Sequence, residues 1–234
     1  MNKRSGKGGL ETPVYEIKAS VSSRVRFALV SDLHCAPSRP VIEAIKNGSP
    51  DAVHVCGDFS HSKKTKEVGL EFLYMSAKLF PTFVGFGNHD LDSGVSASDV
   101  EKTGAVPLDD AFVRFKGILI GGLSPRKGGP DTAFLDRFSR EKGFRLLLCH
   151  YPHYYDKFVK GYPVDLTLSG HAHGGQWRFF GRGVLAPGQG LFPKYTSGFY
   201  DGGRLFVCRG AGNGAPVPRI NNPREVVFFD LISE

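Results

Sequence analysis

Short apolar runs alternate with amphipathic stretches along the first two thirds of the chain, and this pattern predicts the secondary structure. Helices are expected over 40–47 and 65–79, where the apolar residues of the second stretch recur at helical spacing. Five apolar runs have the length of buried strands, and they lie near 26–31, 52–57, 82–87, 146–148 and 166–168. Strands that alternate with helices predict a layered α/β domain up to about residue 170.

The remaining segments predict further strands and one more helix. Alternation over 14–19 indicates a short edge strand, and 113–120 predicts a hairpin that turns at Lys116-Gly117. A helix is expected over 130–142, with Gly143 directly after it. After Gly174 there is no helical period, and three short β runs predict a second sheet in the C-terminal part: 176–180, 203–208 and 225–232. We therefore expect an α/β fold with a two-sheet β-sandwich flanked by helices.

Length and hydropathy favour one domain without a membrane span. Residues 24–234 are expected to form it, after a basic segment, 1–23, that we expect to be frayed up to about Gly9. No apolar run reaches the roughly 18 to 20 residues that a transmembrane helix needs, and the first 23 residues hold no apolar core of a secretory signal. A cytoplasmic protein is therefore expected, with peripheral membrane contact left open.

Charge and cysteine content add limits to this interpretation. Thirty basic residues against 23 acidic residues give a net charge of +7, which favours anionic partners without distinguishing nucleic acid, anionic lipid and phosphorylated small molecules. The four cysteines show no C-x-x-C spacing. We interpret the three that adjoin polar clusters as small apolar fillers rather than as ligands.

Clusters of metal-ligating side chains follow the five apolar runs. The clusters are Asp32-Leu33-His34, Gly57-Asp58, Gly87-Asn88-His89-Asp90, His150 and Gly170-His171-Ala172-His173. If the strands lie side by side, all five clusters meet along one edge of the sheet. Asp32 and His34 are two residues apart, so an extended backbone would direct both side chains to one ion.

Each cluster alone has an ordinary interpretation, such as a helix cap, a turn residue or a core histidine. Together they predict a site for two divalent cations, a tool for hydrolysing phosphate esters. Oxygen and imidazole ligands suit Mn, Fe or Zn.

The ordered series Asp-x-His, Gly-Asp, Gly-Asn-His-Asp, His and Gly-His-x-His resembles the calcineurin-like metallophosphoesterase superfamily over about 140 residues. The strings 168–176 and 209–212, with Pro218-Arg219, are similar to a bacterial phosphodiesterase branch. That branch includes cell-envelope phosphodiesterases and UDP-diacylglucosamine diphosphatases. One departure is Phe59-Ser60-His61, where many members carry an acidic or amide residue.

The resemblance implies an α/β/β/α fold with a dimetal site at one rim. It implies that one metal is held by Asp32, His34, Asp58 and His173, and the other by Asp58, Asn88, His150 and His171. It also implies that His89, held by Asp90, protonates the leaving oxygen or stabilises the charge that develops there. We expect His153 to contact the substrate, and His54 and His61 to be packing or surface residues.

The expected activity is that of a metal-dependent phosphodiesterase or diphosphatase acting on a small-molecule or lipid-linked substrate. A nuclease is the alternative that the net charge favours, although Lys and Arg are scattered rather than striped. A catalytically inactive binding scaffold is the third class of function that we consider. The aromatic and basic segment 177–200 either forms a lip for substrate or fills the core of the second sheet, and the sequence leaves both open.

Overall fold

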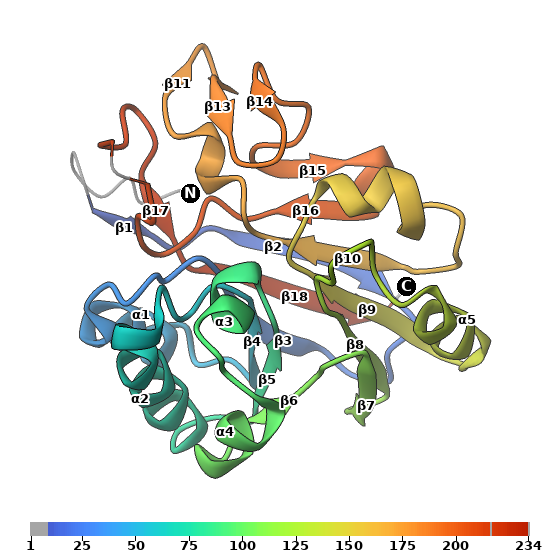
Figure 1. Ribbon diagram of the computed structural model, residues 1–234. Coiled ribbons are helices and arrows are strands. Elements are labelled where there is room, and N and C mark those ends of the chain that lie inside the picture. Colours follow the sequence, from blue (N-terminus) through green and yellow to red (C-terminus); the bar gives the residue numbers. More distant parts are fainter. Residues whose placement is uncertain (1–8, 216, 234) are drawn as a thin grey trace.

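Two six-stranded sheets pack face to face, and helices cover both outer faces (Figure 1). This arrangement is seen in a computed structural model that describes residues 9–215 and 217–233. The predicted α/β sandwich flanked by helices is confirmed. The segment that was expected to be frayed lies almost wholly outside the described residues.

The first sheet has the strand order β2-β18-β3-β4-β5-β6. Strands β3 to β6 run parallel, whereas β18 is antiparallel to β3 and parallel to the edge strand β2. The bounds are Val14–Ala19 (β2), Val25–Val30 (β3), Ala52–Cys56 (β4), Thr82–Gly85 (β5), Val106–Pro107 (β6) and Val227–Ser233 (β18). The edge strand and the first three predicted buried strands are therefore confirmed.

The second sheet has the order β15-β16-β10-β9-β8-β7. Strands β8, β9, β10 and β16 are parallel, and antiparallel strands form both edges. The bounds are Ala111–Phe115 (β7), Ile118–Leu123 (β8), Phe144–Cys149 (β9), Leu166–Ser169 (β10), Gly198–Tyr200 (β15) and Leu205–Val207 (β16). The predicted hairpin is β7–β8, and its turn has positive φ at Lys116 (47°) and Gly117 (81°).

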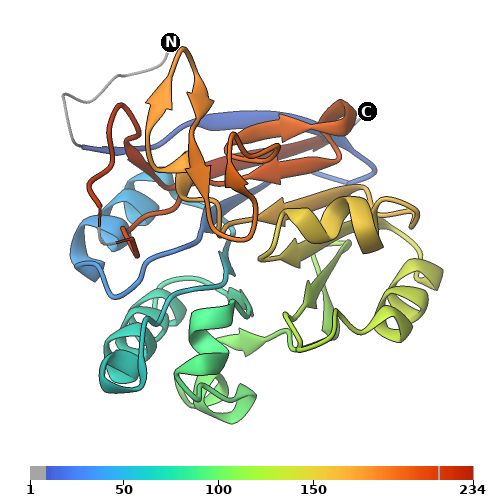
Figure 2. The same cartoon turned by 45° about the horizontal axis from the view of Figure 1, so that its top comes forward.

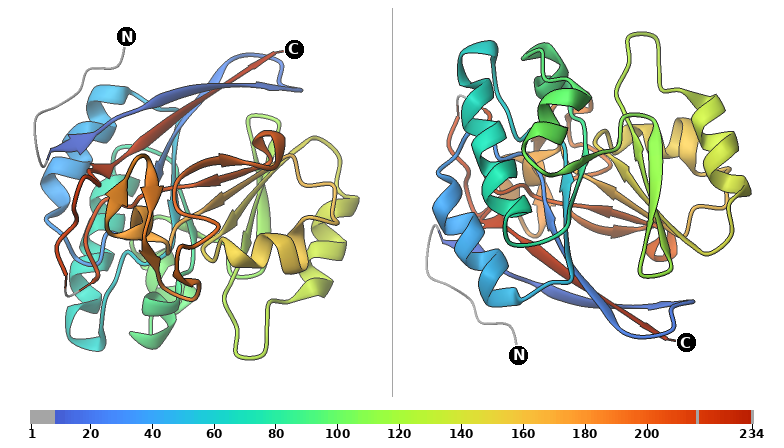
Figure 3. Two further views of the ribbon diagram at one scale, coloured as in Figure 1. Left: turned by 90° about the horizontal axis from the view of Figure 1, so that it is seen from above. Right: turned by 90° about the horizontal axis from the view of Figure 1, so that it is seen from below.

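Alternate residues of the strands face the two sides of each sheet. Phe27 and Leu29 of β3 pack between the sheets against strands of the second sheet, whereas Ala28 and Val30 face the helices. The helices are α1 (Ser38–Gly48), α2 (Lys66–Ala77), α3 (Asn88–Asp92) and α4 (Ala97–Lys102) beside the first sheet, and α5 (Thr132–Arg140) and a π-helical turn (Tyr155–Val159) beside the second (Figure 3).

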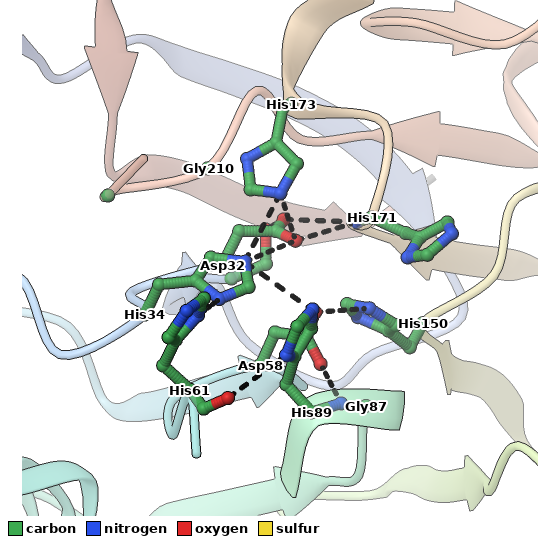
Figure 4. Close-up of polar contacts among 12 residues, drawn as sticks. Asp32, His34, Asp58, His61, Gly87, His89, His150, His171, His173 and Gly210 are labelled. Atoms are coloured by element: carbon green, nitrogen blue, oxygen red, sulfur yellow. Dashed lines mark hydrogen bonds and ion pairs between the residues drawn. The ribbon is translucent and has the colours of Figure 1, made fainter. Parts of the chain in front are cut away.

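Two predictions about the sheets are wrong. The C-terminal strands do not form the second sheet by themselves, because β18 inserts between β2 and β3 of the first sheet. The five strands that precede the polar clusters also do not share one sheet, since β3, β4 and β5 belong to the first and β9 and β10 to the second. Their carboxyl ends still meet, because the two sheets pack with these ends at the same rim (Figure 4).

Three small ribbons complete the chain. Figures 1 and 2 show two of them projecting beyond the rim: β11 (Arg178–Phe179) with β12 (Arg182–Gly183), and β13 (Leu185–Ala186) with β14 (Gly190–Leu191). The third pairs β1 (Leu10–Glu11) with β17 (Arg224–Glu225). Among the residues that the structure describes, no helix has the length and apolar character needed to cross a bilayer.

Candidate metal centre

The five predicted clusters converge in loops at the carboxyl ends of β3, β4, β5, β9 and β10 (Figure 4). Three groups of side chains there could each hold one cation, because the potential ligand atoms within each group lie within 4.8 Å of one another. The group of His34, His61 and His89 contains no carboxylate, and the other two consist entirely of predicted ligands. One group is Asp32, His34 and His173, and the other is Asp58, His150 and His171. The structure thus brings together six of the seven predicted ligands in these two groups.

In the first group, two imidazole nitrogens face each other at close range. His34 Nε2 and His173 Nε2 are 3.1 Å apart, and both face Asp32 Oδ1, at 4.0 and 3.7 Å. Two neutral imidazole nitrogens that face each other can share only one proton, whereas a divalent ion would accept both lone pairs. The donor set therefore fits a divalent metal.

Asp58 lies between the two groups. Its Oδ2 is 3.6 Å from His34 Nε2 and 3.2 Å from His150 Nε2, while its Oδ1 accepts a hydrogen bond from the backbone N–H of His89 at 2.9 Å. One carboxylate oxygen therefore reaches both groups, which is the position that a bridging ligand requires.

Two predicted ligands, His150 and Asn88, have buried atoms that lack a hydrogen-bond partner. His150 Nδ1 donates to the carbonyl of Cys56 at 2.9 Å, so the neutral ring has its lone pair on Nε2, which is buried, lies 3.2 Å from Asp58 Oδ2 and makes no hydrogen bond among the described residues. Asn88 Oδ1 is likewise buried with no partner among residues 9–215 and 217–233. Unpaired buried acceptors are costly unless something satisfies them, and a cation would do so for both.

The loops that carry these side chains have an unusual backbone. Asp32, His34, Asp58, His171 and His173 all have positive φ, between 45 and 64°. Side chains at such positions are strained, and strain of this kind concentrates at functional sites. The prediction that Asp32 and His34 project from extended backbone is therefore wrong, since both residues are left-handed and their side chains lie together with His34 Nε2 4.0 Å from Asp32 Oδ1.

Burial and charge adjust the ionisation of the site. Burial lowers the pKa of His34 to about 4, of His173 to about 3 and of His171 to about 2, so these imidazoles stay neutral, the form that binds metals. Burial opposes a charge on His150 too, but the Asp58 and Asp32 carboxylates outweigh it and raise its pKa to about 10. These carboxylates therefore favour a proton on His150 Nε2, and a cation would have to displace that proton in order to bind there.

Asp90 does not hold His89, and that prediction is wrong. The buried Asp90 carboxylate accepts hydrogen bonds from the backbone N–H groups of Asp58 (2.7 Å), Ser60 (2.8 Å) and Gly87 (2.9 Å). It therefore ties the loop after β4 to the loop after β5. Burial and then the Asp58 charge raise the pKa of Asp90 to about 8.

His61 contacts the site, which the sequence interpretation missed. Its Nδ1 lies 3.1 Å from His34 Nδ1, and its ring stacks on His89 with centroids 5.0 Å apart. Its carbonyl accepts a hydrogen bond from His89 Nδ1 at 3.1 Å. The departure from the family pattern at this position was the only signal in the sequence. His54, by contrast, is buried and stacks on Phe27, as expected.

The segment after His173 supplies both core and surface. Tyr195 is buried in the outer core of the second sheet, whereas Phe180 and Phe192 are exposed. His153, the expected substrate contact, stacks on Tyr151 and lies with its ring centroid 6.2 Å from that of His171.

A separate groove of about 690 Å³ opens at the amino ends of β9 and β10, lined by residues such as Lys18, Arg145 and Asp165. It lies at the opposite end of these strands from the clusters, and none of the candidate ligands lines it.

Comparisons with known proteins agree with this geometry. The family model for calcineurin-like phosphoesterases matches residues 25–175. The uncharacterised metallophosphoesterase YkuE of Bacillus subtilis is 27% identical over an alignment of 267 positions, gaps included, which covers 96% of this chain and 86% of the relative. An uncharacterised metallophosphoesterase of Aquifex aeolicus is 28% identical, with 92% and 87% covered.

A third relative, from Campylobacter jejuni, is 26% identical, and the match covers 95% of this chain but 64% of that protein's length. Among solved structures, the phosphopantetheinyl hydrolase of Mycobacterium tuberculosis has a TM-score of 0.55 at 15% identity, over 84% of this chain and 92% of that one, which indicates a shared fold. The family match covers well over half of the chain. Calcineurin-like phosphoesterases use divalent metal ions to hydrolyse phosphoesters, and the chain belongs to this family.

Proposed function

We propose that this protein is a dinuclear metal-dependent phosphodiesterase or diphosphatase. The observation that carries the proposal is the position of Asp58, whose Oδ2 lies within 3.6 Å of His34 Nε2 and 3.2 Å of His150 Nε2. A carboxylate between two groups of nitrogen and oxygen ligands suits a pair of cations rather than a single ion. Manganese, iron or zinc fits the oxygen and imidazole donors.

The proposed ligand assignment follows the two groups. Asp58 belongs to both sets: one cation would be held with Asp32, His34 and His173, and the other with Asn88, His150 and His171. When bound, the two cations would offset charge on the phosphoryl oxygens and lower the pKa of water. Hydrogen bonds hold the proposed ligands in position. Asp32 accepts a hydrogen bond from the backbone N–H of His171 at 2.9 Å, and Asp90 accepts one from the backbone N–H of Asp58 at 2.7 Å.

His89 is the proposed proton donor to the leaving oxygen. Its Nδ1 donates to the His61 carbonyl at 3.1 Å, which leaves Nε2 as the atom that holds the transferred proton. The ring lies edge-on to His34 with centroids 4.8 Å apart, so it stands beside the first group of ligands. His153, on the other side near His171, is the proposed substrate contact.

The preference for a diester or a pyrophosphate rests on the resemblance of 168–176 to the bacterial phosphodiesterase branch. The test is hydrolysis of bis-p-nitrophenyl phosphate and p-nitrophenyl phosphate by metal-stripped protein titrated with Mn²⁺. Asp58→Ala and His89→Asn should each lose metal-dependent diester cleavage. Asp58→Ala should also lose Mn²⁺ affinity, whereas His89→Asn should keep it.

Turnover of single-stranded DNA in preference to the diester would favour the nuclease alternative. Metal binding without turnover of any of these compounds would favour the scaffold. A wild-type protein that binds no divalent cation would overturn the proposal.

A further inference from the structure

Two hairpins that follow the His171-Ala172-His173 loop carry the four most exposed large apolar side chains of the described residues. Phe180 is fully exposed (105%), and Phe192, Leu191 and Phe179 are 82%, 68% and 51% exposed. All four lie within the hairpins β11–β12 and β13–β14 or directly after them. Apolar side chains that gather in this way mark a contact surface.

These hairpins stand at the mouth of the metal centre. A Cβ added at Gly183 of β12 would lie 2.7 Å from Cα of Gly175, so the first hairpin packs directly on the turn after His173. A Cβ at Gly188, in the turn of the second hairpin, would lie 3.2 Å from the ring of His153 and 3.6 Å from His171 Nε2. A partner that covers the hairpins would therefore also face the site.

The backbone at the exposed tips indicates that the aromatic residues are not there for folding. Phe180 and Gly181 form the two-residue turn of the first hairpin, with φ of 49 and 79°, a turn that favours Asn-Gly. Phe192 also has positive φ, at 52°. A bulky side chain is disfavoured in this conformation, and an exposed ring gains nothing from burial. Strain without burial indicates a role in binding.

The charge of the surrounding chain favours an anionic partner. Between Asp165 and Glu225 the only acidic residue is Asp201, and 166–200 contains none. Arg182 is exposed beside the first tip. Lys194 follows Phe192 closely and pairs with Asp156, which joins the second hairpin to the π-helical turn where Lys157 is exposed. Exposed aromatic and leucine side chains among basic residues are typical of interfacial membrane binding.

We propose that the surface formed by Phe179, Phe180, Leu191 and Phe192 docks on an anionic lipid bilayer. Docking turns the mouth of the metal centre toward the headgroups. The substrate class that this orientation selects, a lipid-linked phosphoester, rests on the proposed function, whereas docking itself does not.

The test is sedimentation of the metal-stripped full chain with vesicles of phosphatidylcholine and phosphatidylglycerol in a three-to-one mixture. The variant Phe180→Ser/Phe192→Ser should bind at least about tenfold more weakly, because two exposed rings no longer enter the bilayer. The matched control is Tyr74→Ser/Leu79→Ser, which removes side chains of 46% and 48% exposure in the distant helix α2 and just after its end (Figure 1). It should bind as the wild type does, and unfolding midpoints confirm that both variants are folded.

Binding should fall on vesicles of phosphatidylcholine alone and at high salt. Three results would each overturn docking: no binding of wild type to the mixed vesicles, equal binding of the hairpin variant, or equal loss in the control. Hydrolysis of bis-p-nitrophenyl phosphate by the Mn²⁺-loaded wild type is measured separately. Vesicle binding without turnover rejects the proposed function alone, and turnover without vesicle binding rejects docking alone.

Discussion

Replacing Gly87 by alanine should disable the metal centre without unfolding the protein. Gly87 has φ −105° and ψ 175°, which alanine adopts freely, so the effect is steric. A Cβ there would lie 2.5 Å from the backbone nitrogen of Asp58 and closer still to Asp58 Oδ1. Ordinary contacts between heavy atoms begin near 3.5 Å, so Asp58 must move by roughly 1 Å.

That displacement sets the expected magnitude. Overpacking of this kind costs about 1–3 kcal/mol of stability. A misplacement of about 1 Å in a catalytic constellation costs on the order of 100-fold in rate. We therefore expect Gly87→Ala to lower kcat/KM for bis-p-nitrophenyl phosphate about 100-fold and to weaken Mn²⁺ binding, with the folded state retained in urea unfolding.

Gly94→Ala is the matched control. Gly94 has φ +73° and no heavy atom within 4 Å of an added Cβ, so alanine there costs about 1 kcal/mol of left-handed strain and displaces nothing. It should be destabilised while its kcat/KM and Mn²⁺ affinity stay at the wild-type level. Normal metal binding and turnover in Gly87→Ala would show that the close approach of Gly87 does not position Asp58 as a bridging ligand. An equal loss of activity in Gly94→Ala would show the same.

Three further predictions concern His61, the effect of metal on stability, and Asp230. His61→Ala removes the ring that lies 3.1 Å from His34 Nδ1, so we expect about tenfold weaker Mn²⁺ binding in a titration of metal-stripped protein, with partial recovery in His61→Asn. Saturating the protein with Mn²⁺ at about 100 times its Kd should raise the free energy of unfolding by about 3 kcal/mol, and a calorimetric scan that shows no shift on chelation would refute metal binding to the native state. Asp230 forms two hydrogen bonds of 2.7 Å with Arg26, which lower its pKa to about 2. Because the folded pKa is depressed, the pair should contribute about 1–2 kcal/mol above pH 4 and lose that contribution as pH falls through about 2. The stability difference between wild type and Asp230→Asn should therefore shrink by about half near pH 3, and a pH-independent difference would contradict the assignment.

That the polar clusters lie close together could be predicted from the sequence because of a general property of parallel strands, whereas their assignment as ligands came from the family resemblance and stays a prediction. Ligands that directly follow buried strands are carried to one end of a sheet, so Asp32, Asp58 and Asn88 could be placed together without coordinates. The neighbouring sheet delivers His150 and His171 to the same rim in the same way. Strand lengths and the α/β alternation could be predicted from hydrophobic periodicity, because this periodicity is visible within a short window of the sequence.

Pairing between distant segments could not be predicted in this way. Strand β18 is buried at its first five positions and reads as a core strand, but nothing in its pattern shows that it inserts beside β3, some 200 residues earlier. The wrong assignment of Asp90 has a similar cause. Its neighbour in sequence is His89, yet its carboxylate turns to backbone N–H groups of another loop. Left-handed residues such as His34 reverse the side-chain direction that an extended chain would give.

Electron paramagnetic resonance of the Mn²⁺-loaded protein shows whether Asp58 joins two cation sites. Two Mn²⁺ ions that share a carboxylate interact magnetically and give a coupled spectrum that differs from the six-line pattern of isolated ions. We predict two Mn²⁺ per chain with a coupled spectrum in the wild type, and loss of coupling in Asp58→Ala. A wild-type protein that binds one Mn²⁺, or two with only the six-line pattern, would contradict the dinuclear centre.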